Sequence, residues 1–196
     1  MLQAPIRRRK TANVIIFAVF LLLMTALPAT RAGETGNLGK TGVTPAASIT
    51  RYAIADTFVN AAKPTTTYGS AEDMHVGRAE GKDRYILVQF DISDIHVGSS
   101  ITSAYLDLHT VYNQTAGITA PTAFYVWPYR ILGNWGEGST TWYTQPSVTS
   151  MSDPASDAQA GGTWIRWTVT NIVSSWIEDG RPNYGIELRG DGTTTG

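Results

Sequence analysis

The sequence predicts an all-β domain with one short helix, preceded by an N-terminal signal segment. Three observations favour strands and turns over helices: 19 glycines among 196 residues, a texture rich in threonine and serine, and several short runs in which apolar and polar residues alternate. Hydrophobic residues make up 42% of the chain, which suffices for one core of ordinary size. Cysteine is absent, so disulfides, thiol nucleophiles and Cys-ligated zinc are excluded.

The first 32 residues have the three parts of a secretion signal. A basic stretch (RRRK) precedes the apolar run Val14–Met24, and Thr30 and Ala32 are small residues at the −3 and −1 positions of a cleavage site. The alternative is a retained membrane anchor, but the apolar stretch Ala12–Leu27 has 16 residues, against about 20 needed to cross a bilayer. The sequence therefore predicts a signal peptide over 1–32 and a secreted mature form with no membrane span.

Residues 33–50 are rich in Gly, Thr and Ser and have no periodicity, which predicts a flexible linker. The folded domain is predicted over 51–196. Because 1–32 contains five basic residues and no acidic one, the rest of the chain has a formal charge of −6. This charge excludes a nucleic-acid partner for the folded part.

Alternating runs predict the strands in order. The clearest is Arg84–Ile92, in which Ile86, Val88, Phe90 and Ile92 share one face, predicted to be core, while the other face is predicted to be mostly solvated. The remaining runs are bounded by Gly, Pro or Asn: Ile101–His109, Ala123–Tyr129, Thr163–Val169 and Tyr184–Arg189. Several short strands on one core predict a sandwich or a barrel.

One helix interrupts the strands. Thr170 is predicted to cap a helix over Asn171–Asp179, and Gly180 is predicted to end it. Four of its residues form a single apolar stripe: Ile172, Val173, Trp176 and Ile177. We expect the helix to cover one end of the sheets.

An ordered series of short motifs runs through the chain. The series contains ADTFV at Ala55–Val59, YGS at Tyr68–Ser70, the strands Arg84–Ser93 and Ile101–Leu108, Trp135-Gly-Glu137, the Thr-Trp-x-x-x-Pro pattern in Thr140–Pro146, and the strand, helix and strand from Trp167 to Gly185. This series resembles the DNRLRE domains, which are similar to carbohydrate-binding module family 96. The resemblance covers about 56–190. It implies an extracellular β-sandwich of the jelly-roll type that accompanies polysaccharide-degrading enzymes or cell-surface proteins, with acidic polysaccharides such as alginate among the ligands.

The chain departs from this family's pattern after Arg189. The family continues into a further strand, whereas here Gly190–Gly196 follows. A missing strand leaves backbone groups unpaired and an apolar stripe uncovered. We therefore expect a chain truncated at its C-terminal end, with a larger parent or neighbouring domain supplying the missing strand. The alternative is that the last strand is dispensable.

Aromatic residues are the candidate ligand-binding groups, because planar side chains stack on the C–H faces of sugars. Trp142, Trp167 and Trp176 lie in apolar-periodic positions and are predicted to be core. The exposed candidates are Tyr105, Tyr125, Trp127 and Tyr129. Guanidinium groups to bind uronate carboxylates would come from Arg130, Arg166 and Arg189.

Catalytic and metal-binding patterns are weak. No Gly-x-Ser-x-Gly elbow is present, and the three histidines stand in separate segments. Asp56 and Asp191 are the candidate ligands for a structural calcium ion, and the alternative for Asp56 is a turn cap.

Three functional classes follow. The first is a secreted, non-catalytic carbohydrate-binding module that recognises an extracellular polysaccharide, with acidic polysaccharides among the ligands that the resemblance implies. The second is a structural or adhesive cell-surface sandwich without glycan affinity. The third is a polysaccharide lyase or hydrolase, which would need two convergent carboxylates.

Overall fold

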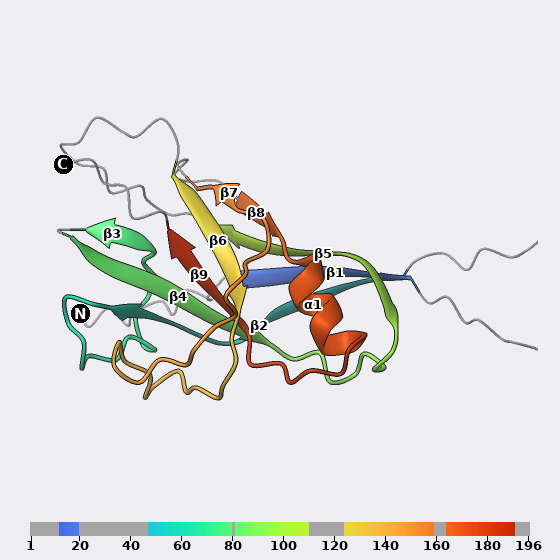
Figure 1. The fold of residues 1–196 in the computed structure, drawn as a ribbon, viewed down its shortest axis with the longest axis horizontal. Coiled ribbons are helices and arrows are strands. Elements are labelled where there is room, and N and C mark those ends of the chain that lie inside the picture. Colours follow the sequence, from blue (N-terminus) through green and yellow to red (C-terminus); the bar gives the residue numbers. More distant parts are fainter. Residues whose placement is uncertain (1–11, 20–46, 80, 110–123, 159–163, 191–196) are drawn as a thin grey trace, which may run out of the picture.

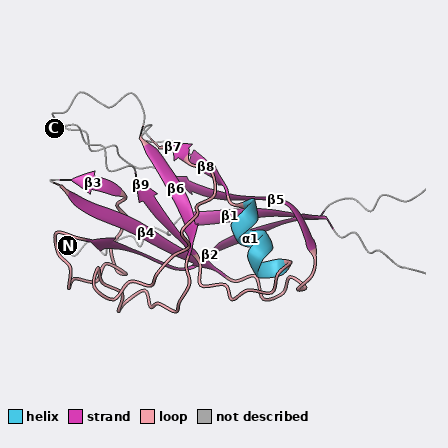
Figure 2. Cartoon of the chain, in the orientation of Figure 1, coloured by secondary structure: helices cyan, strands magenta, loops and turns pink. Residues whose placement is uncertain are grey.

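A computed structural model of the chain describes residues 12–19, 47–79, 81–109, 124–158 and 164–190 (Figure 1). Strands dominate the described part, with one short helix (Figure 2). The strands are β1 (Ala12–Val19), β2 (Ala47–Asn60), β3 (Gly77–Ala79), β4 (Lys82–Phe90), β5 (Ser100–His109), β6 (Tyr125–Arg130), β7 (Ser156–Asp157), β8 (Trp164–Thr168) and β9 (Ile186–Gly190), and the helix is α1 (Thr170–Ile177). The predicted all-β fold is confirmed.

The described strands pair antiparallel in the order β7-β6-β9-β4-β2-β1-β5-β8, with β3 beside β4. Strand β2 belongs to both layers of the sandwich. Its first half pairs with β1, and its second half pairs with β4 after an irregularity between Ala53 and Ala55. One layer therefore contains β1, β5 and β8, and the other contains β3, β4, β9, β6 and β7.

The main core lies between the two layers. Phe90 on β4 and Leu106 on β5 are both buried in it. The indole N–H of Trp167 on β8 donates a hydrogen bond of 2.8 Å to the backbone oxygen of Val126 on β6, which joins the layers directly. The same cluster contains Trp176, so two of the three tryptophans predicted to be core are confirmed there.

The second face of β4 differs from the prediction. Gln89 is half-buried and Asp91 is exposed, but Leu87 is fully buried. It packs with Val59 and Ile131 in a second apolar cluster, against which Trp135 and Trp142 lie partly buried. The segment that follows β6 brings these tryptophans over β4, so this face is only partly open to solvent.

Helix α1 buries the predicted stripe of Ile172, Val173, Trp176 and Ile177. The predicted cap is wrong, because the Thr170 side chain makes no cap hydrogen bond and its Oγ1 instead accepts from the Ala104 backbone N–H at 3.1 Å. Asp153, far away in the sequence, accepts from the Ile172 N–H at 3.0 Å and from the Asn171 side chain at 2.7 Å. A distant carboxylate thus satisfies the helix N-terminus.

Strand β1 lies inside the stretch predicted to be a signal peptide. Its backbone pairs with β2 from Asn13 to Ala18 and with β5 from Ala12 to Val19, so it stands between them in the sheet (Figure 1). Removal of 1–32 stays a prediction. Within the described residues, no helix is long and apolar enough to span a membrane.

Candidate functional site

The outward face of β6, β9 and β4 collects four of the seven candidate binding residues. Strand register places Trp127 beside Arg189, and Arg189 beside Tyr85. The next row along the strands places Tyr129 beside Glu187. Side chains on one face alternate with the core-facing residues between them, so Tyr125, Trp127 and Tyr129 lie on the same side as Arg189.

Arg189 is at the centre of this face. The carbon of its guanidinium group lies 4.6 Å from the centroid of the Tyr85 ring and 5.2 Å from that of Tyr129. Its Nε atom donates to Glu187 Oε1 at 2.6 Å, and 33% of its side chain is exposed. Two cation–π contacts and one charged hydrogen bond hold the guanidinium group in place while leaving part of it open to solvent.

Glu187 supports Arg189 from the neighbouring position on the same face of β9. Its side chain is 0% exposed, and among the described residues its Oε2 atom has no hydrogen-bond partner. Burial raises the pKa of Glu187, and the nearby Arg189 opposes this rise only in part. Glu187 therefore positions the guanidinium group and is not itself accessible to a ligand.

Aromatic rings extend the surface on both sides of Arg189. The rings of Tyr125 and Trp127 are 6.1 Å apart, and those of Tyr85 and Trp142 are 5.1 Å apart. Tyr125 is 43% exposed. Burial is the largest cause that raises the pKa of Tyr85, so its hydroxyl stays protonated at neutral pH. We call the set Tyr85, Tyr125, Trp127, Tyr129 and Arg189 the Arg189 platform.

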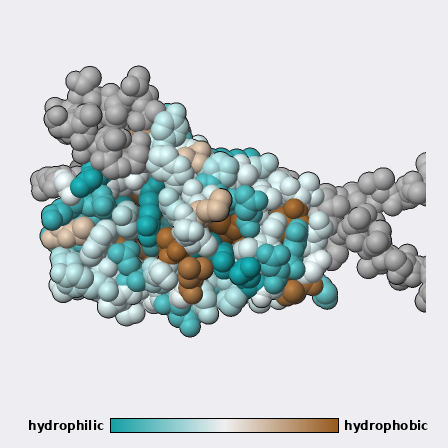
Figure 3. Space-filling view, in the orientation of Figure 1, coloured by the Kyte–Doolittle hydropathy of each residue, from teal (hydrophilic) through white to brown (hydrophobic). Residues whose placement is uncertain are grey.

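Hydrophobic residues are scattered over one displayed face of the molecule. In Figure 3, the hydrophobic residues visible on the displayed face form small, separate clusters among hydrophilic ones. Large apolar patches mark sites that bind proteins or membranes. Scattered apolar groups among polar ones are ordinary on protein surfaces and do not by themselves mark a binding site.

A second constellation lies on the outward face of the other layer. Arg166 on β8 donates from Nε and Nη2 to the two carboxylate oxygens of Asp107, at 2.8 and 2.7 Å. Its guanidinium carbon lies 4.9 Å from the Tyr105 ring centroid. His109 and Trp164 meet edge to face at 5.3 Å. We call Tyr105, Asp107, His109, Trp164 and Arg166 the Arg166 cluster.

The remaining candidates lie apart from both sets. Arg130 pairs with the core residue Ile186 and shares the core-facing side of β6 with Val126, so the structure does not place it on the platform. Asp56 is buried in β2, and Asp191 lies outside the described residues. The described part of the chain contains no group of three His, Cys, Asp or Glu side chains that would hold a metal ion.

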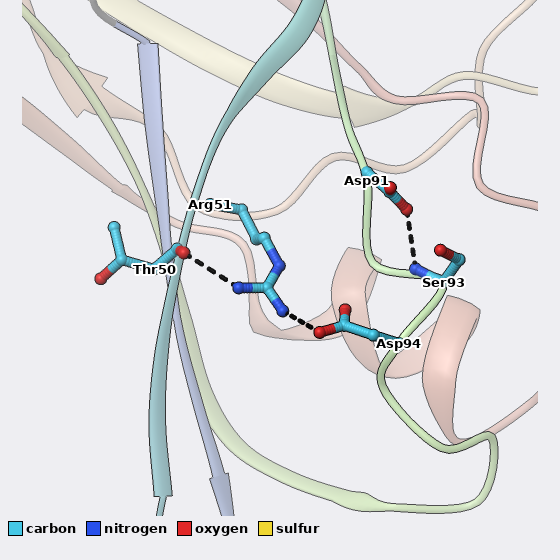
Figure 4. Close-up of polar contacts among 5 residues, drawn as sticks. All are labelled: Thr50, Arg51, Asp91, Ser93 and Asp94. Atoms are coloured by element: carbon cyan, nitrogen blue, oxygen red, sulfur yellow. Dashed lines mark hydrogen bonds and ion pairs between the residues drawn. The ribbon is translucent and has the colours of Figure 1, made fainter.

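An ion pair anchors β2 to the loop after β4 (Figure 4). Arg51 binds the Asp94 carboxylate and also donates to the Thr50 backbone oxygen at 3.2 Å. Within the same loop, Asp91 accepts from the Ser93 N–H at 3.0 Å, and hydrogen bonding to Ser93 lowers the pKa of Asp91. These contacts fix the first half of β2 independently of the platform.

The family model of carbohydrate-binding module family 96 matches residues 47–195, which include both constellations and every described element except β1. The chain belongs to carbohydrate-binding module family 96. No curated protein matches the chain. Membership assigns carbohydrate binding as the general role of the module, and modules of this kind are typically non-catalytic and commonly extracellular.

The sequence did not identify Glu187 or Tyr85 as parts of a site. Alternation along β9 is the signal that was available, because it places Glu187 and Arg189 two residues apart on one face with opposite charges. The register between β4 and β9, which brings Tyr85 beside Arg189, is a long-range feature. No local pattern in the sequence encodes it.

Proposed function

We propose that the module binds an extracellular acidic polysaccharide at the Arg189 platform and does not cleave it. The observation that carries the proposal is the Arg189 guanidinium group, held between Tyr85 and Tyr129 and hydrogen-bonded through Nε to Glu187. Among the described residues, its two Nη atoms have no hydrogen bond, so they supply donors for a uronate carboxylate.

Aromatic side chains supply the second half of the recognition. Tyr125 and Trp127 lie along β6 beside Arg189, and each ring offers a flat surface for the C–H face of a sugar ring. Stacking contributes about 0.5–1.5 kcal/mol per contact beyond the buried area. A chain of uronic acid units running along β6 would place a carboxylate on Arg189 and a ring on Trp127.

Electrostatics give the binding a specific salt dependence. Residues 33–196 have a formal charge of −6, which repels a polyanion at long range. Attraction to Arg189 acts at contact distance and weakens with added salt, whereas stacking is affected little. We therefore expect binding that decreases with salt but does not vanish.

Export completes the proposal. We expect the mature protein to begin near Gly33, as the sequence of 1–32 predicts. The intact mass of exported protein tests this directly, and a full-length mass in a membrane fraction would favour the anchor instead.

Calcium at Asp56 and Asp191 also stays a prediction, which an unchanged melting temperature after EDTA treatment would contradict.

Affinity electrophoresis in gels containing alginate, with a neutral glucan as the control, tests the binding. The double variant Trp127→Ala/Tyr129→Ala should lose most of the retardation, whereas Trp164→Ala in the opposite layer should keep it. Trp164 is a matched control because it is also an exposed aromatic residue on a strand.

Two outcomes would contradict the proposal. No retention at low salt would favour a structural or adhesive sandwich. Release of unsaturated or reducing ends from alginate would favour a lyase or hydrolase, a reaction for which the buried Glu187 offers no accessible carboxylate.

A further inference from the structure

Strand β1 fills a gap one strand wide. Val14 pairs with Arg51 of β2 on one side and with Leu106 of β5 on the other, and Ile16 pairs with Ile49 and Ala104. The pairing is antiparallel on both sides, so β1 is a central strand of its layer (Figure 1).

The two neighbours of β1 do not pair with each other among the described residues. The first half of β2 pairs with β1, and β5 pairs with β1 on one edge and with β8 on the other. Without β1, two strand edges with unpaired N–H and C=O groups would face each other across the gap. The core-facing sides of the two flanking strands are apolar at this point, because Ile49 on β2 packs against the main core and Ala104 and Leu106 on β5 belong to it.

The connection of β1 to the rest of the chain is long. Residues 20–46 separate it from β2, whereas the loops of β-hairpins have about 2–5 residues. The ion pair between Arg51 and Asp94 fixes β2 without any contribution from β1. The family match begins at residue 47 and leaves β1 outside. The gap is therefore defined by the module, while the strand within it comes from a separately tethered segment.

We propose that the gap between β2 and β5 is a strand-acceptor site for an extended segment of another polypeptide. Ala12–Val19 occupies the site in the precursor, and a partner segment replaces it once residues 1–32 are removed. The partner segment has about eight residues with apolar side chains at alternate positions and no proline, and it runs antiparallel to both β2 and β5. Main-chain hydrogen bonds supply affinity and alternate side chains supply specificity in this mode of recognition.

Cysteine cross-linking of the full chain tests whether β1 occupies the gap in solution. The chain has no cysteine of its own, and Ile15 pairs with Thr50, so Ile15→Cys with Thr50→Cys should form a disulfide on mild oxidation. In the control pair, Phe17→Cys with Tyr52→Cys, the two positions are four residues out of register, about 13 Å apart along the strands. The control should not cross-link. Equal yields in both pairs, or no disulfide in the first, would overturn the proposal.

Peptide exchange tests the acceptor site itself. A protease site inserted within 36–42 allows the folded full chain to be cut, after which a labelled peptide of residues 11–20 with added lysines is supplied. The control peptide contains Val14→Pro and Ile16→Pro, which remove two N–H donors. We expect the first peptide to bind at least tenfold more tightly and to raise the melting temperature of the cut protein.

Two outcomes of the peptide exchange would overturn the proposal. Equal binding of both peptides would indicate non-specific apolar contact, and no binding of either would restrict the site to its own strand. A dimer of cut protein that exchanges its own segments would identify a second copy as the partner. The proposal does not rest on glycan binding, and alginate retention of the same samples reports on the platform separately.

Discussion

The Arg189 platform and the Arg166 cluster contain the same kinds of interacting residues on the two outward faces of the sandwich. Each has an arginine paired with a carboxylate and in contact with a tyrosine ring. In the platform, Arg189 uses Nε alone toward a fully buried Glu187 and lies between two rings. In the cluster, Arg166 binds both oxygens of Asp107 through Nε and Nη2 and lies over one ring.

The difference shows that the geometry of the carboxylate decides what the arginine is free to do. The bidentate pair uses two of the five N–H donors of Arg166, on Nε and Nη2, and both oxygens of Asp107. The single contact of Arg189 through Nε orients its guanidinium group and leaves both Nη atoms as donors. The cluster is therefore expected to stabilise the pairing of β5 with β8, and the platform is expected to bind.

The largest expected effect comes from disrupting the main core, on which both outward faces depend. Phe90 is buried in the main core at 1% exposure, and Phe90→Asp would place an unpaired carboxylate there, at a cost of more than about 4 kcal/mol. We expect the domain to unfold and both faces to be lost. Thermal unfolding measures this, with Phe90→Leu as the mild control. A soluble Phe90→Asp protein with an unchanged melting temperature would contradict the assigned core.

The next prediction separates the two faces directly. Lysine keeps the charge but lacks the planar fork, so Arg189→Lys should weaken alginate binding about tenfold, a change of about 1.4 kcal/mol. Arg166→Lys, made in the opposite layer, should leave binding unchanged. Titration calorimetry of the two variants measures both. Equal losses would place the ligand on the cluster as well.

The strands of the fold were predictable because their alternation is local. The runs that became β4, β5, β6, β8 and β9 each carry their own signal, as does the apolar stripe of α1. The capping of α1 by Asp153 was not predictable, because it depends on a residue brought close by the loop after β6. The burial of Leu87 was not predicted for the same reason, since a segment distant in the sequence covers it.

The pairing of strand β1 and the composition of the candidate site also depend on long-range contacts that local sequence patterns do not predict. Ala12–Val19 has the composition of a leader, and nothing local indicates that it would pair with β2 and β5. The seven candidate binding residues were chosen only by the side of a predicted strand on which each side chain was expected to lie. Alternation along β6 correctly groups Tyr125, Trp127 and Tyr129 and already places Arg130 on the opposite side, whereas only tertiary packing separates Arg189 from Arg166.

A smaller effect tests how Glu187 supports the platform. Burial raises its pKa in the folded state, so the folded protein holds this proton more strongly than the unfolded chain does. The free energy of unfolding that depends on Glu187 is therefore greatest at low pH and falls as the pH rises from the ordinary glutamate pKa through the raised one. Glu187→Gln keeps an acceptor for Arg189 Nε but removes the titration.

Chemical denaturation of both proteins between pH 4 and pH 8 measures this. The stability of Glu187→Gln relative to the native protein should increase with pH. Asp153, whose pKa burial also raises, is present in both proteins and cancels in the difference. A relative stability that does not change with pH would show that Arg189 compensates the buried charge in full, and one that decreases with pH would show that the pKa of Glu187 is lowered instead.

The smallest expected effect concerns Asp107 in the Arg166 cluster. The side chain of Arg166 is 53% exposed and that of Asp107 is 12% exposed, and because solvent reaches the guanidinium group we take the range of exposed ion pairs, about 0–1 kcal/mol. Asp107→Asn keeps one acceptor oxygen for Arg166, so we expect a loss of stability within that range that shrinks further in 1 M salt, where the Debye length is about 3 Å. Alginate binding should stay the same, because the freed guanidinium group lies in the layer opposite the platform. A gain in binding on Asp107→Asn would instead show that the closed ion pair is what keeps the Arg166 cluster from acting as a second binding face.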